Sequence, residues 1–119
     1  KSFNKAYKYI NGEFIIDLAA DDLLTPTAVE NHIKNFDKNL NAGISYSNIE
    51  YVTPKGKHYS YFYKVDENTF YKFDFSPKSG NLYNELLATF YLSACGMCVA
   101  KRVYDTLEGY DESLDYEET

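Results

Sequence analysis

The fold of this chain is decided by residues 12–26, which read GEFIIDLAADDLLTP. The apolar run over residues 13–18, interrupted by a single acid, predicts a short β-strand in a central position of a sheet. Two adjacent carboxylates, Asp21 and Asp22, follow this strand, and Thr25-Pro26 then predicts the start of a helix with Thr25 as its cap. A strand that leads through two acids into a helix indicates an α/β protein.

Asp21 and Asp22 allow two interpretations. At the carboxyl end of a strand in an open α/β sheet they lie where such folds bind ligands, and adjacent like charges are held best beside a cation. This predicts a divalent metal that carries a phosphate-bearing substrate. Alternatively, one acid caps the following helix, since Asp is common at that position. Thr25-Pro26 supplies a cap of its own, which favours the metal site.

The composition limits the class of protein. The chain has 119 residues, of which 45% are hydrophobic and 18% aromatic, and this predicts one folded domain rather than a disordered chain. The net charge is −6, but seven acids lie from Asp105 onward and the rest of the chain carries +1. Without a basic surface we expect no nucleic-acid partner. No apolar run reaches ~20 residues, so we also expect no membrane-spanning helix, and no secretory leader is visible.

The two cysteines have the spacing Cys95-Gly-Met-Cys98, which is that of half a zinc or redox site. A closed zinc site needs four ligands, and the remaining soft candidates are His32 and His58, which fall in an expected helix and an expected hairpin. Both cysteines lie in the apolar run 92–100, where Cys packs as a small hydrophobic residue. We therefore expect reduced thiols and a cytoplasmic protein.

Elsewhere the periodicity predicts an alternation of helices and strands. The expected helices cover residues 3–11, 25–40, 82–90 and 101–107, and the expected strands cover residues 13–18, 44–52, 58–65 and 97–100. The second helix should bury one stripe of side chains: Val29, Ile33, Phe36 and Leu40. The strands on either side of the turn at residues 53–57 predict a hairpin. A doubly wound sheet normally has further strands before such a central one, so we expect this sheet to be incomplete at its N-terminal side.

Two separated segments resemble the family 2 glycosyltransferases, which have the GT-A (Rossmann-like) fold of nucleotide-diphospho-sugar transferases. In that family Gly-Glu-Tyr-Ile leads into Leu-Asp-x-Asp-Asp, with a Pro shortly afterwards. Here Gly12–Ile15 leads into Leu18–Asp22, with Pro26 at the matching place, and the upstream Asn4-Lys5-Ala6 is similar to the family's Asn-x-Ala helix. Ala19 stands where the family has its first Asp, so this chain lacks one carboxylate of the motif.

The second segment covers residues 109–118 and resembles the Gly-Phe-Asp-Glu-x-Leu stretch that leads into the family's acidic pair. Residues 96–102 just before it resemble the acceptor-side strand, and Gly109 is expected to close the helix over 101–107. The resemblance covers the middle and late part of such a catalytic domain, without the region that holds the nucleotide base. It implies that residues 1–119 form a single, partial glycosyltransferase domain: part of a mixed sheet with flanking helices and a hairpin.

The resemblance also implies a reaction. Asp21 would ligate Mn²⁺ or Mg²⁺ and, together with Asp22, bind a nucleotide-sugar donor. Glu118, with Glu117 beside it, matches the catalytic base that takes the proton from an acceptor hydroxyl on a saccharide or a lipid-linked molecule, as in cell-wall or polysaccharide biosynthesis. One base opposite the leaving group implies inversion at the anomeric carbon.

Two other functions stay open. The chain could be a non-catalytic α/β interaction module that forms homo-oligomers through a Tyr-rich hairpin, comprising Tyr46, Tyr51, Tyr59, Tyr61 and Tyr63. It could also be a metal-dependent phosphoesterase that uses Asp21 and Asp22. That chemistry usually requires a cluster of His and Asp ligands, which the sequence does not offer.

Overall fold

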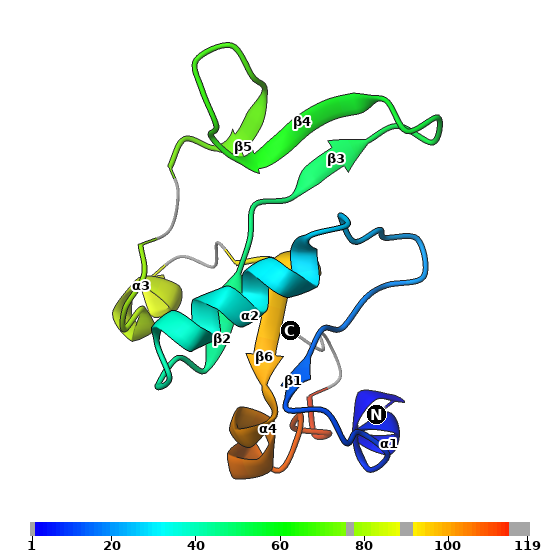
Figure 1. The fold of residues 1–119 in the computed structure, drawn as a ribbon, viewed down its shortest axis with the longest axis vertical. Coiled ribbons are helices and arrows are strands. Elements are labelled where there is room, and N and C mark those ends of the chain that lie inside the picture. Colours follow the sequence, from blue (N-terminus) through cyan, green and yellow to red (C-terminus); the bar gives the residue numbers. More distant parts are fainter. Residues whose placement is uncertain (1, 76–77, 89–91, 115–119) are drawn as a thin grey trace. The chain divides into compact units, whose positions relative to one another are not determined.

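The computed structural model describes residues 2–75, 78–88 and 92–114 of the chain. Over these residues the protein is mixed α/β, with two three-stranded sheets and four α-helices, which confirms the predicted fold class at that level. The chain divides into two compact units (Figure 1): unit 1 comprises Lys1–Tyr46 and Met97–Thr119, and unit 2 comprises Ser47–Gly96. That both units belong to one domain stays a prediction.

Unit 1 holds one sheet and three helices. Its elements in chain order are α1 (Ser2–Tyr7), β1 (Phe14–Ile15), α2 (Ala28–Lys38), β2 (Ile44–Tyr46), β6 (Met97–Ala100) and α4 (Lys101–Leu107). The strand order is β1-β6-β2, and β6 is antiparallel to both of its neighbours. In Figure 1, β6 accordingly lies between the other two strands.

The central strand of this sheet is β6, not the strand expected over residues 13–18. That prediction of a central position is wrong for the described residues, in which β1 pairs only with β6 and forms an edge. The reason is visible in the burial of side chains. Cys98, Val99 and Ala100 are all buried, so β6 is covered on both faces, as a central strand must be. In β1 only Ile15 is buried.

The two faces of β6 carry two parts of the core. On one face Val99 packs with Ile15 and Tyr104, and aromatic side chains of α1 close this cluster. On the other face Cys98 and Ala100 pack with Phe36 of α2, whose ring stacks on Phe14 at a centroid distance of 4.4 Å. Successive residues of a strand point to opposite faces, which explains the division. The core therefore packs α1 against one face of β6 and α2 against the other, while Val103 of α4 contacts both clusters.

Helix α2 begins later than Thr25-Pro26 predicts. Its N-cap is Thr27, and the earlier residues form a turn in which the Ala28 amide donates to the Thr25 carbonyl at 3.0 Å. The predicted stripe is also only partly buried. Phe36 is 4% exposed and Ile33 is half-buried, whereas Val29 is 53% and Leu40 82% exposed. The unpredicted member of the buried face is His32, one turn before Phe36.

The first and last residues of unit 2, Ser47 and Gly96, are hydrogen-bonded to each other through their backbones. The Ser47 amide donates to the Gly96 carbonyl at 2.8 Å, and a side chain at Gly96 would meet the Ser47 carbonyl oxygen at 2.7 Å. The strand predicted over residues 44–52 is therefore broken. Its first part is β2 in unit 1, and its last part is a strand of unit 2, because the two parts pair with different partners.

The elements of unit 2 are β3 (Glu50–Val52), β4 (His58–Tyr63), β5 (Tyr71–Phe73), α3 (Tyr83–Ala88) and a short 3₁₀ turn, Ala94–Gly96. The predicted hairpin is confirmed: β3 and β4 are antiparallel, and β5 pairs parallel to β4. Gly56 takes a φ of 75° in the connecting turn, a conformation that favours glycine. Residues 89 and 90 of the helix expected over 82–90 lie outside the described residues. In the described part of the chain, no helix is long and apolar enough to cross a membrane.

Candidate functional site

The two acids of the first motif lie on a turn that follows β1. Asp21 is exposed and Asp22 half-buried, and the Asp22 amide closes the turn by donating to the Ala19 carbonyl at 3.1 Å. Neither acid caps α2, because the N-cap of that helix is Thr27. The structure thus removes the helix-cap interpretation of this pair for α2. Both side chains are accessible to a ligand from solvent.

Pairing of β1 with β6 brings together strands from the two segments that carry the resemblance. Phe14 lies opposite Ala100 and Ile15 opposite Val99. The Lys101 amide extends this contact by donating to the Glu13 carbonyl at 2.8 Å. The strand before the acid pair is therefore bonded directly to the strand that leads into α4 and the second motif.

Helix α1 holds the turn of the second motif through one side chain. The Asn4 amide nitrogen donates to the Tyr110 carbonyl at 2.8 Å and to Glu112 Oε1 at 3.0 Å, and Asn4 Oδ1 accepts from the Tyr110 amide at 2.9 Å. Phe3 adds a ring contact to Tyr110, with centroids 4.7 Å apart. Asn4 and Tyr110 are 106 positions apart, so this contact links the described ends of unit 1.

Gly109 allows the close approach of Asn4. Its φ is 90°, and a Cβ at this position would lie 2.5 Å from Asn4 Oδ1. Glu108 before it is also left-handed, with φ 60°, and the two residues end α4. The predicted closing of the helix by Gly109 is correct, with Glu108 as the cap residue.

Glu117 and Glu118, the predicted catalytic pair, lie outside the described residues, which end at Leu114. The nearest described parts of the second motif are Asp111 and Glu112, and both are exposed. Asp111 accepts from the Ser113 amide at 2.9 Å, and hydrogen bonds from Ser113 hold the pKa of Asp111 below its usual range.

A polar cluster ties α1 to α4 beside this turn. Lys101 Nζ lies 2.7 Å from Asp105 Oδ1 and 3.3 Å from the Tyr7 hydroxyl, which donates to the same carboxylate. Hydrogen bonding from Lys101 lowers the pKa of Asp105, and hydrogen bonding to Asp105 raises the pKa of Tyr7. The side chains of Lys101, Tyr7 and Asp105 are hydrogen-bonded to one another, so this cluster has a structural role in holding α1 against α4.

Within residues 2–75, 78–88 and 92–114, no group of three or more His, Cys, Asp or Glu side chains could hold a metal ion. Cys95 is exposed and Cys98 buried, and burial raises the pKa of Cys98. The candidate metal ligands that remain are Asp21 and its neighbour Asp22. One or two carboxylates suffice for Mg²⁺ when substrate phosphates and water supply the other ligands, so this pair fits a shared metal rather than a protein cage.

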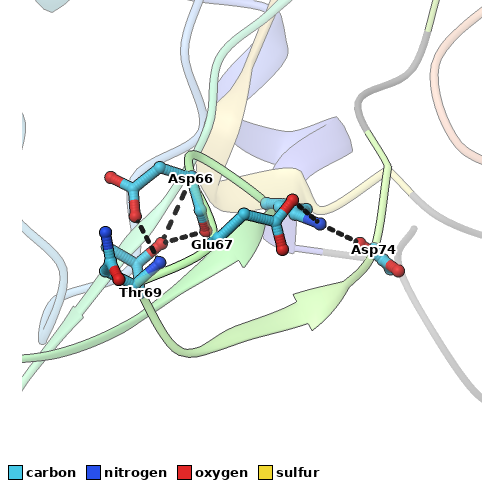
Figure 2. A network of polar contacts seen from close by, with 6 residues as sticks. Asp66, Glu67, Thr69 and Asp74 are labelled. Atoms are coloured by element: carbon cyan, nitrogen blue, oxygen red, sulfur yellow. Dashed lines mark hydrogen bonds and ion pairs between the residues drawn. The ribbon is translucent and has the colours of Figure 1, made fainter.

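The acids of unit 2 in Figure 2 have partners of their own. Lys64 Nζ bridges Glu67 at 2.7 Å and Asp74 at 3.1 Å, and these hydrogen bonds raise the pKa of Lys64. Asp66 closes its loop by accepting from the Asn68 amide at 2.7 Å, while Thr69 donates to the Asp66 carbonyl. The network stabilises the connection between β4 and β5.

The Tyr-rich surface is smaller than the sequence predicts. Tyr59 is 69% and Tyr51 39% exposed, and Tyr61 is half-buried. Tyr63 is only 3% exposed and lies against Phe62 and Phe73, and Tyr46 belongs to β2 in unit 1. The prediction that these last two tyrosines belong to an exposed hairpin surface is therefore wrong.

Sequence reasoning missed the contact between Asn4 and the 109–112 turn. The Asn-x-Ala pattern and the glycine after α4 are both visible in the sequence, but nothing in their spacing says that they meet. Comparisons of this chain with models of protein families, with curated proteins and with solved structures gave no match.

Proposed function

We propose that this chain carries the metal-binding and acceptor-side part of an inverting glycosyltransferase with a GT-A fold, similar to family 2. One observation supports this most: the two segments that carry the resemblance meet in one unit. Asn4 of the first segment bonds to Tyr110 of the last, and β1, which leads to the acids, pairs with β6. A metal ligand and a general base must act on the same substrate, so we expect the motifs that carry them in the same part of the fold.

In this proposal Asp21 ligates Mn²⁺ or Mg²⁺, and Asp22 helps to bind the donor. The metal supplies Lewis-acid stabilisation of the charge on the departing nucleoside diphosphate. The oxygen of Asp21 is a hard ligand on an exposed turn, which suits a cation that keeps water and phosphate ligands. Ala19 provides no carboxylate, so we expect weaker nucleotide contacts than in relatives with both acids.

Glu118, or its neighbour Glu117, is the proposed general base. Its carboxylate accepts the proton of an acceptor hydroxyl as that oxygen bonds to the anomeric carbon of the sugar. The bond between this carbon and the diphosphate oxygen breaks, the nucleoside diphosphate leaves, and the configuration inverts. The acceptor is a saccharide or a lipid-linked molecule, and the proposal includes a cytoplasmic location.

Calorimetric titration with a panel of nucleotide-diphospho-sugars, with and without Mn²⁺, tests the proposal. We expect binding that requires the metal and that weakens by about 10-fold or more in Asp21→Asn, because charged contacts to a metal-bound ligand are strong. Asp37→Asn is the matched control, since it removes one exposed carboxylate from α2 of the same unit. If the gene encodes residues before Lys1, the titration is repeated on the longer chain.

Nucleotide-sugar binding that does not depend on Mn²⁺, or that has the same affinity in Asp21→Asn, would contradict the proposed site. If no nucleotide-sugar binds to either chain, the transferase proposal fails. Analytical ultracentrifugation of Tyr59→Ser then tests the interaction module, since Tyr59 is the most exposed hairpin tyrosine.

A further inference from the structure

A cavity of about 560 Å³ lies in unit 1 at the end of the sheet away from the acid pair. It is lined by residues at the start of β1 and at the end of β6, among them Glu13, Phe14 and Ala100. The turn with Asp21 follows the other end of β1. The cavity is therefore separate from the turn with Asp21 and Asp22, and its volume is that of a pocket for a small molecule.

Part of the cavity lining is apolar. Phe14 and Phe36 stack there with an angle of 22° between their rings, and Ile10 and Leu40 extend the apolar lining. Leu40 leaves 82% of its surface exposed. A ligand with an apolar body would remove this surface from water, which is favourable.

The basic groups of the cavity are already engaged. Lys101 is paired with Asp105 at 2.7 Å. Arg102 donates from Nη2 to the Leu40 and Ala42 carbonyls at 3.2 Å and 2.5 Å, which fixes the guanidinium against the chain after α2. Neither side chain is free to turn toward a ligand without giving up these bonds.

Two carboxylates of the lining have no side-chain partner among the described residues: Glu13 and Asp37. The cavity contains three acids and two bases, so its formal charge is −1. A ligand that carries one positive charge would neutralise it. An anion would meet two unpaired carboxylates and two engaged cations.

From this lining we propose that the cavity binds a small organic ammonium ion with an aromatic or aliphatic body. The body lies on the Phe14–Phe36 pair, and the ammonium group lies between Glu13 and Asp37. This inference does not depend on the proposed transferase activity.

The test is a titration of the ¹⁵N-labelled chain with 2-phenylethylammonium chloride, followed by NMR. We expect the largest shifts at the amides of Gly12–Phe14, Phe36–Leu40 and Ala100–Arg102. The neutral 2-phenylethanol and the anionic 3-phenylpropanoate should bind several-fold more weakly. Glu13→Gln and Asp37→Asn should each weaken binding of the ammonium by about 2- to 5-fold, the usual size of an exposed ion pair.

Asp21→Asn is the control, because it removes the same charge from the same unit at the other end of the sheet. It should leave the binding of 2-phenylethylammonium unchanged. Equal binding of the alcohol, stronger binding of the anion, or shifts outside the cavity would overturn the proposal, and so would the absence of saturable shifts at millimolar concentration. The substituted side chains are exposed, so we expect each variant to fold. An NMR spectrum of the ligand-free variant that matches the spectrum of the unaltered chain will show this.

Discussion

Gly109→Ala should destabilise unit 1 by about 2–4 kcal/mol. The residue is left-handed, with φ 90°, and an L side chain costs about 1–2 kcal/mol in that region. Its Cβ would also lie 2.5 Å from Asn4 Oδ1, so the Asn4 side chain must move. Asn4 makes three hydrogen bonds to Tyr110 and Glu112. Their loss adds about 1–2 kcal/mol, since each contributes roughly 0.5–1.5 kcal/mol and some are replaced by water.

Gly56→Ala is the matched control for the backbone contribution. Gly56 has a φ of 75°, but a Cβ added there would meet no atom within 4 Å, so only the conformational cost applies. Urea unfolding followed by NMR, with Val99 amide intensity for unit 1 and Phe62 amide intensity for unit 2, gives both free energies. In an Asn4→Ala background, Gly109→Ala should cost only what Gly56→Ala costs. If Gly109→Ala costs no more than Gly56→Ala in the unaltered chain, the contact with Asn4 contributes nothing and the reasoning is refuted.

Two further predictions concern other parts of unit 1. Glu108→Asn should raise the free energy of unfolding by about 0.5–1 kcal/mol, because Asn tolerates the φ of 60° at this helix end and the substitution removes an acid from the negative end of α4. Urea unfolding measures this change, and a loss of stability would contradict the prediction. Burial lowers the pKa of His32 below its ordinary value of 6.5, so the unfolded chain takes up the proton first as the pH falls. Stability should therefore be constant above about pH 7 and fall below pH 6.5. Thermal unfolding across this range should show a smaller loss of stability in His32→Gln than in the unaltered chain if His32 causes the loss.

The sequence predicted those features that local pattern determines. The hairpin around residues 53–57, the helix over 101–107 and its end at Gly109 all follow from spacing and turn residues, and all are present. The acid pair does follow a strand, but β1 covers only Phe14–Ile15 instead of residues 13–18, so the acids do not lie directly at its end. The role of the pair stays a prediction, because a carboxylate on an exposed turn looks the same from sequence whether or not it binds metal.

The features that sequence reasoning missed depend on contacts between distant segments. An apolar run such as residues 13–18 satisfies the pattern of a central strand, but only pairing decides which strand is central, and here it is β6. Likewise, Val29 and Leu40 have the spacing of a buried stripe, but Val29 lies in the first turn of α2 and Leu40 beyond its last residue, and both are exposed. His32 is buried, and the cost is offset by Ser45 Oγ in β2, 2.8 Å from its Nδ1, a partner that helical periodicity does not reveal.

The hydrogen bond between Ser47 and Gly96 has a thermodynamic consequence for the whole chain. β2 and β6 are adjacent antiparallel strands, and unit 2 is the segment of the chain that connects them. While unit 2 is folded, the Ser47 amide nitrogen and the Gly96 carbonyl oxygen lie 2.8 Å apart. The end of β2 and the start of β6 are therefore already close together. If unit 2 unfolds, the sheet must close a loop of residues 47–96, and the entropy of closure relative to a tight turn is on the order of 3 kcal/mol. Folding of unit 2 therefore stabilises unit 1 through connectivity alone. A substitution that destabilises one unit will also lower the free energy of unfolding of the other.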